Sequence, residues 1–170
     1  MHLMDVKSLQ REMLRLLEDY TGCKVVPANT TKQMPNYPYI SYSLLNVDTR
    51  KGTYSAHTGT KIVEGIETPV NMLSMPARLK YSFTVQSDDD VEALIHAISI
   101  KDFFEESKRQ ELADIGLIVS DVGGITPRDN MLTIEYEYRK GLDVTLSLNN
   151  VMESADVGVI SDATINDVNL

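Results

Sequence analysis

The chain has 170 residues, the usual size of one domain and enough to bury an apolar core without disulfides or a structural metal. Sixteen Lys and Arg against 25 Asp and Glu give a formal net charge of −9, so the chain lacks the excess of cations that binding to nucleic-acid phosphates needs. The lone Cys23 cannot form an internal disulfide, and no apolar run approaches the roughly 18 residues of a membrane span. We therefore expect a soluble protein in a reducing cytoplasm, and neither sequence-specific DNA binding nor membrane insertion.

The first part of the chain predicts an amphipathic helix over residues 5–20. Its apolar residues recur at helical spacing: Val6, Leu9, Met13, Leu16, Leu17 and Tyr20. Gly22 stands just beyond, where a left-handed residue commonly closes a helix. A short extended segment at 24–26 and a loop over 28–38 are expected to follow.

Residues 39–47 are rich in aromatic and β-branched side chains and predict a strand, with Ile40, Tyr42 and Leu44 on one face. The segment 48–61 contains two glycines and no apolar periodicity, which favours an exposed loop or hairpin tip. Residues 62–70 are expected to form a further strand.

Residues 79–86 carry the clearest strand pattern, because Leu79, Tyr81, Phe83 and Val85 alternate with polar residues. Ser87 before three aspartates predicts an N-cap and a helix start. The expected buried stripe of this helix comprises Val91, Leu94, Ile95 and Ile98. A second helical piece with Phe103, Phe104 and Leu112 is expected to end near Gly116.

The last part predicts a strand at 117–119, a break at Gly123–Gly124, and a long β-hairpin of strands 131–139 and 142–149 turning at Gly141. Residues 150–170 contain no Lys or Arg and favour a linker with one final strand. The predicted fold class is α+β: a mainly antiparallel sheet with an N-terminal helix and a central helical segment packed on one face. We expect one domain over 1–149 and an acidic C-terminal extension over 150–170.

Catalytic and metal-binding patterns are not found. His2, His57 and His96 are too far apart in the sequence to form a known metal motif, and Cys23 follows a helix end, where a thiol pKa is not lowered. The Asp88–Asp90 run could attract a divalent metal, but helix capping explains it better. No nucleophile elbow or phosphate-binding loop is present. We therefore expect neither an enzyme nor a cofactor.

Three segments together resemble the phage neck or tail terminator family of tailed phages and prophages. They are Asn36–Tyr42 at the start of the first long strand, Leu79–Val85 before the acidic helix start, and Tyr138–Val144 in the final hairpin. The resemblance runs from about Val6 to Leu148. The chain departs from the family pattern at Leu142, where an aromatic residue is common, and in its acidic tail.

The resemblance implies a virion structural protein that forms a ring, often hexameric, at the head-proximal end of the tail tube. Such a ring stops tube polymerisation and offers a surface to the head connector. The implied partners are further copies of the chain, the tail tube protein, head connector proteins and, through non-specific contact, DNA in the lumen. The implied location is the tail neck, with the host cytoplasm during assembly. The alternatives are another head–tail joining or tail tube protein, a small cellular adaptor, or an enzyme.

Two groups of residues are candidate interface residues. Basic and aromatic side chains gather in the expected loop 48–61 of this acidic chain: Arg50, Lys51, Tyr54, His57 and Lys61. They are either a solvated loop that aids solubility or a segment that orders against an acidic neighbour or DNA. The second group is the polar face of the clearest strand, which has no predicted chemistry to occupy it: Lys80, Ser82, Thr84 and Gln86.

Overall fold

A computed structural model describes residues 6–49, 55–131 and 136–153 of the chain. The helices are α1 (Val6–Thr21), α2 (Asp90–Asp102), the π-helical turn η1 (Phe103–Ser107) and α3 (Arg109–Asp114). The strands are β1 (Lys24–Pro27), β2 (Tyr39–Thr49), β3 (Ser55–Val63), β4 (Ile66–Ser87), β5 (Ile118–Val122), β6 (Thr126–Pro127), β7 (Asn130–Met131) and β8 (Tyr136–Glu153).

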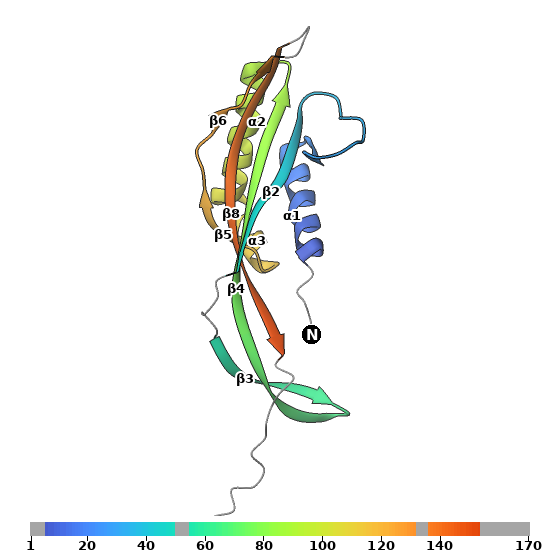
Figure 1. Ribbon diagram of the computed structural model, residues 1–170, viewed down its shortest axis with the longest axis vertical. Coiled ribbons are helices and arrows are strands. Elements are labelled where there is room, and N and C mark those ends of the chain that lie inside the picture. The colour runs from blue at the N-terminus through green and yellow to red at the C-terminus, as the bar shows by residue number, and fades with distance from the viewer. Residues whose placement is uncertain (1–5, 50–54, 132–135, 154–170) are drawn as a thin grey trace, which may run out of the picture.

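The main sheet has the strand order β1-β2-β4-β8-β5, and only the β1–β2 pair is parallel. The helices lie on one side of this sheet, and the long strands β4 and β8 form its centre (Figure 1). This arrangement confirms the predicted α+β class with an N-terminal helix and a central helical segment.

The core lies between the sheet and the helices, as the alternation in 79–86 predicts. The sheet contributes buried side chains at every second position: Leu79, Tyr81, Phe83 and Val85 from β4, and Leu142, Val144, Leu146 and Leu148 from β8. The helical side contributes Met13, Leu17, Ala93, Ala97, Ile100, Phe103, Phe104 and Leu112. The predicted first helix, its end at Gly22 (φ +70°) and the second helical piece ending near Gly116 (φ +97°) are also confirmed.

The expected loop over 48–61 is largely strand. β2 continues to Thr49, and β3 pairs with the first part of β4 from Ser55↔Ser74 to Val63↔Ile66. The turn therefore falls at Glu64 and Gly65, both with positive φ, inside the segment 62–70 that was expected to be one strand. Hydrogen bonding to β4 forms this strand although its sequence has no apolar alternation. We call β3 and its partner segment 66–74 the arm, which extends below the helix-covered body in Figure 1.

The predicted hairpin turn at Gly141 is wrong, because β8 runs unbroken through this glycine and pairs with β4 along its length. The sequence contained the signal, since the alternation keeps the same parity on both sides of residue 141. Gly141 is buried mid-strand, and a Cβ there would lie 2.7 Å from the guanidinium of Arg128. The glycine thus makes room for a side chain that crosses the sheet. Part of the expected first hairpin strand, 132–135, lies outside the described residues.

Two details of α2 differ from expectation. The N-cap is Asp89 rather than Ser87, because its Oδ1 accepts from the backbone N–H groups of Val91 and Glu92 at 2.8 and 3.0 Å. The Ser87 hydroxyl instead donates to Glu92 Oε2 at 2.5 Å.

The predicted buried stripe of α2 is the exposed one. Ala93, Ala97 and Ile100 face the core, because two alanines let the helix axis approach the sheet closely. The larger residues consequently lie on the far side of the helix, exposed: Val91, Leu94, Ile95 and Ile98.

Candidate assembly surfaces

The basic residues of segment 48–61 are only partly placed. Arg50, Lys51 and Tyr54 lie outside the described residues. His57 and Lys61 belong to β3, where their backbones pair with Met72 and Thr68 of the arm. Whether these residues form an interface stays a proposal.

The polar strand residues project on the outer face of the sheet, away from the helices, but Arg128 covers two of them. Its Nη1 donates to Ser82 Oγ at 2.6 Å and to Thr84 Oγ1 at 3.0 Å, and its Nη2 pairs with Asp143 Oδ1 at 3.0 Å. Backbone hydrogen bonds hold the segment in place, since Arg128 N–H donates to the Arg139 carbonyl at 2.7 Å. This contact could not be predicted from the sequence, because Arg128 stands outside any periodic element.

Gln86 is buried, so it is not an exposed interface residue. Its side-chain amide lies 2.7 Å from the hydroxyl of Ser41, which is also buried. A buried amide needs such partners to offset the loss of water. Gln86 therefore joins β4 to β2, and of the four expected face residues only Lys80 is exposed.

Asp143 connects the covered and the open parts of the outer face. Partial burial opposes its ionisation, but hydrogen bonds from Arg128 and Ser82 and the charges of Arg128 and Lys80 outweigh it, so the pKa of the carboxyl lies below its usual value. Lys80 Nζ lies 3.5 Å from the other carboxylate oxygen. The carboxylate is thus held between two cations.

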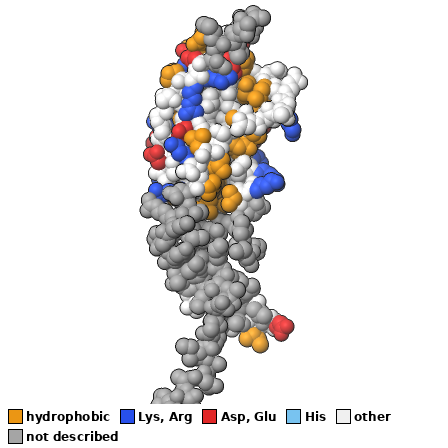
Figure 2. All heavy atoms as spheres, viewed as in Figure 1, with side chains coloured by type: hydrophobic (Ala, Val, Ile, Leu, Met, Phe, Trp, Pro, Cys, Tyr) orange, Lys and Arg blue, Asp and Glu red, His pale blue; other side chains and the backbone are white. Residues whose placement is uncertain are grey.

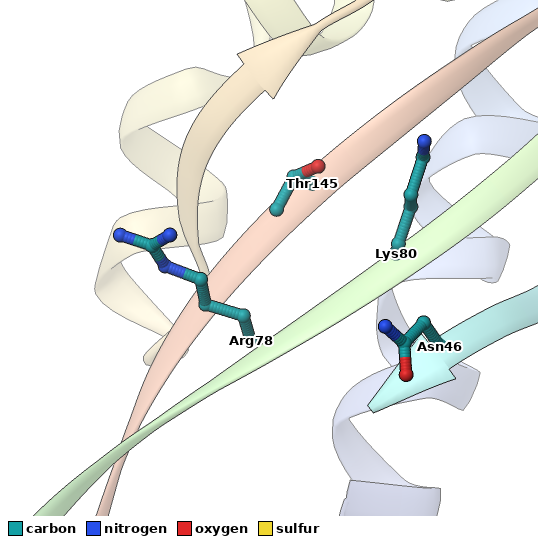
Figure 3. A pocket seen from close by; sticks show the side chains of 4 residues that line it. All are labelled: Asn46, Arg78, Lys80 and Thr145. Carbon is teal, nitrogen blue, oxygen red and sulfur yellow. The ribbon is translucent and has the colours of Figure 1, made fainter. Parts of the chain in front are cut away.

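A hollow of about 150 Å³ opens beside Lys80 (Figure 3). Its lining comes from three adjacent strands: Asn46 of β2, Arg78 and Lys80 of β4, and Thr145 of β8. Arg78 is exposed and makes no ion pair with any described residue. Two cations with neighbouring hydrogen-bonding groups suit an anionic partner such as a carboxylate.

Large apolar side chains are exposed on two further surfaces. The first, the α2 stripe, comprises Val91, Leu94, Ile95 and Ile98, which are between 41% and 63% exposed. The second, the β2 edge patch, comprises Leu44, Leu45 and Val47, and Leu44, which was expected to share a face with Ile40 and Tyr42, is 43% exposed. Figure 2 shows hydrophobic side chains along the middle of the outer face, with Lys and Arg beside them. Exposed apolar clusters of this kind commonly mark contacts with other proteins.

Cys23 and His96 lie closer together than the sequence indicates, with Sγ 3.3 Å from Nδ1. Burial and the nearby charge of Glu92 raise the pKa of the thiol. A reactive cysteine needs the opposite shift, so this pair joins the end of α1 to α2 rather than forming an activated nucleophile.

In the ranges 6–49, 55–131 and 136–153, no group of three His, Cys, Asp or Glu side chains is arranged to hold a metal ion. None of the helices in these ranges has the length and apolar character to cross a membrane.

Comparison with known proteins identifies one family. A family model described as phage neck terminator protein matches residues 7–169, nearly the whole chain. The search of curated proteins finds no match.

Proposed function

Because the chain belongs to the phage neck terminator protein family, and is thus a structural component of the phage neck, we propose that it forms a closed ring on the head-proximal end of the tail tube. The ring ends tube growth and gives the head connector a surface on which to dock. Its partners are further copies of itself, the tail tube protein and the connector proteins. The subunit is made in the host cytoplasm and becomes part of the virion.

The arm is the observation that carries this proposal furthest. It leaves the helix-covered body, and within the described ranges β3 pairs with β4 alone, while β8 pairs with the arm only at Met72–Ser74. Its tip includes Ile62, which is 71% exposed. An isolated two-stranded hairpin is only marginally stable in water and exposes apolar surface without a core. A projecting arm of this kind is suited to packing against a neighbour in an assembly.

The outer sheet face supplies a second feature that suits assembly. Arg78 and Lys80 present cations around an open hollow on a chain whose net charge is −9. Local positive charge in an acidic protein favours contact with an acidic copy or partner and sets the orientation of the encounter.

Deleting the gene from the phage tests the proposal. Electron micrographs of lysates are expected to show unjoined heads and tubes that exceed the wild-type length, with both defects reversed when the protein is supplied in trans. Heads with no tubes at all would instead identify a tube subunit. Tubes of normal length beside unjoined heads would identify a joining protein without a terminator role.

A further inference from the structure

The α2 stripe is exposed although the opposite side of its helix is packed in the core. A helix advances about 100° per residue, so Val91, Leu94, Ile95 and Ile98 lie on one side, roughly opposite Ala93 and Ala97. His96 contacts Cys23, which follows α1, and Asp102 accepts hydrogen bonds from Tyr20 of α1 and Ser107 of η1. An apolar stripe on both sides of a helix is typical of a helix buried on both sides.

Acidic residues surround this stripe. The segment from residue 88 to residue 106 has a single Lys or Arg, Lys101, which pairs with Glu105 at 3.6 Å, and Lys140 of β8 pairs with Asp90 at 2.6 Å. The acids of the segment are Asp88, Asp89, Asp90, Glu92, Asp102, Glu105 and Glu106. The α2 stripe is therefore an apolar surface with a negative rim.

The β2 edge patch has the opposite charge around it. β1 pairs with β2 only as far as Tyr42, so within the described strands the edge from Ser43 to Thr49 has no neighbour on that side. Leu44 and Val47 are in register with the inward-facing Tyr81 and Leu79 of β4, whereas Lys80 and Arg78 are in register with Asn46 and Asp48 and border this edge from the outer face of the sheet.

The first turns of α1 add cations to this rim. Gln10 of α1 is hydrogen-bonded to Tyr42 and Tyr81, next to the β2 edge patch, and the exposed cations Lys7 and Arg11 lie on the same turns. The β2 edge patch is therefore an apolar surface with a positive rim.

We propose that the α2 stripe of one subunit packs against the β2 edge patch of a second copy of this chain. Apolar side chains form the centre of the contact, and the two rims pair acids with cations. The patches are distinct surfaces of the same subunit, so the contact is head-to-tail and can be repeated until a ring closes. This inference rests on the proposed ring and names the surfaces that build it.

A symmetric contact between two α2 stripes is disfavoured by charge. Antiparallel packing would set Asp88–Asp90 of one copy against Asp102 and Glu105 of the other, with Lys101 as the sole cation of the segment. Like charges facing each other across an interface weaken the association. The complementary pairing avoids this repulsion.

Single charge insertions test each surface. Ile98→Glu places a carboxylate in the α2 stripe, and Val47→Glu places one in the β2 edge patch. Ile118→Glu on β5 is the matched control, because Ile118 and Ile98 are 50% and 52% exposed. All three proteins are expected to keep the wild-type circular dichroism and melting temperature. Analytical ultracentrifugation is expected to show at least a tenfold weaker association for the two patch variants. The control is expected to associate as strongly as the wild type.

Mixing the two patch variants distinguishes a head-to-tail contact from a symmetric one. Each variant retains one good surface, so the mixture is expected to form dimers of one Ile98→Glu and one Val47→Glu subunit, but no rings. Native mass spectrometry identifies them by mass. Homodimers of Val47→Glu would instead indicate the symmetric α2 contact and overturn the proposal.

Cross-linking in assembled particles gives a readout that does not depend on association in solution. The double variant Val47→Cys and Ile98→Cys is expected to form a ladder of disulfide-linked subunits, whereas neither single variant does. If the patch variants assemble as the wild type does and no ladder forms, this assignment of surfaces is wrong while the ring proposal stands. If the wild type forms no ring in particles, the proposed function itself fails. Loss of association in Ile118→Glu alone would place the contact at β5.

Discussion

Arg128 organises the outer face of the sheet at the scale of single residues. Its guanidinium joins β4 to β8 by three side-chain contacts, to Ser82, Thr84 and Asp143. A planar group with several fixed donors suits this role better than a lysine would. The sheet thus gains a polar cross-link on the side that no helix covers.

The low pKa of Asp143 predicts acid sensitivity. Because the folded-state pKa is depressed, the carboxylate contributes stability above its unfolded pKa of about 3.9, and this contribution is lost as pH falls through the folded pKa. Urea denaturation of the wild type is expected to lose more stability between about pH 5 and pH 3 than that of Asp143→Asn. Identical pH profiles would show that the ion pair with Arg128 adds nothing to folding.

Phe83 predicts the cost of truncating a core aromatic residue. Its ring is fully buried and lies 5.3 Å from that of Phe104, so Phe83→Ala is expected to destabilise the fold by roughly 3 to 5 kcal/mol. The comparison is His96→Ala. The sequence places His96 at a partly exposed position of the helix, which predicts almost no change in stability. The contact with Cys23 revises that expectation to about 1 kcal/mol. Chemical denaturation measures the free energy of unfolding of both variants. A larger loss for His96→Ala than for Phe83→Ala would contradict the assignment of buried and exposed sides.

At the scale of elements, β8 has a glycine in the middle of a strand because the side chain of another segment lies against it. Thr126 and Pro127 of β6 pair with Gly141 and Lys140. This pairing places the next residue, Arg128, where its side chain crosses β8. Glycine in a strand interior often marks a close approach of another group. Here the approaching group is a side chain from the connection between β5 and β8.

A double-mutant cycle tests this arrangement. Gly141→Val places a Cβ 2.7 Å from the Arg128 guanidinium, which has to move and give up its partners. The substitution is expected to cost about 1 to 2 kcal/mol in the wild type and little in an Arg128→Ala background, because the obstructing group is then gone. Urea denaturation of the four proteins measures the coupling. A coupling near zero would mean that the two residues act independently.

The elements that could be predicted from the sequence were those with a single apolar periodicity, such as α1 and the strand around Phe83. The large apolar residues of the α2 stripe predict burial from the sequence. In the structure the small side chains of Ala93 and Ala97 face the core instead, because they allow close packing. β3 has no apolar alternation in its sequence. It is a strand because it pairs with β4, and a pattern along the chain does not reveal that pairing. The cover by Arg128 depends on two segments meeting in space, and spacing along the chain does not encode that contact.

At the scale of the whole molecule, the cations of segment 48–61 predict a salt-sensitive assembly. Replacing Arg50, Lys51 and Lys61 with Glu is expected to leave the melting temperature nearly unchanged, because the sequence of this segment has no apolar periodicity with which to join the core. Ring formation or head–tail joining is expected to weaken, and the wild-type association is expected to fall more steeply with added salt. The triple Gln variant separates loss of charge from repulsion. Wild-type yields of infectious particles from the Glu variant would leave the segment with a solubility role only.

The arm and the body share one strand, and this has a mechanical consequence. β4 has 22 residues, so at about 3.3 Å per residue it spans roughly 70 Å without a break. It leaves the arm and runs between β2 and β8 in the body. A pull on the arm therefore loads the hydrogen bonds to both neighbours in shear, many at once, instead of peeling them apart singly. Tension applied at the tip of the arm is therefore expected to reach the core strands along one continuous backbone.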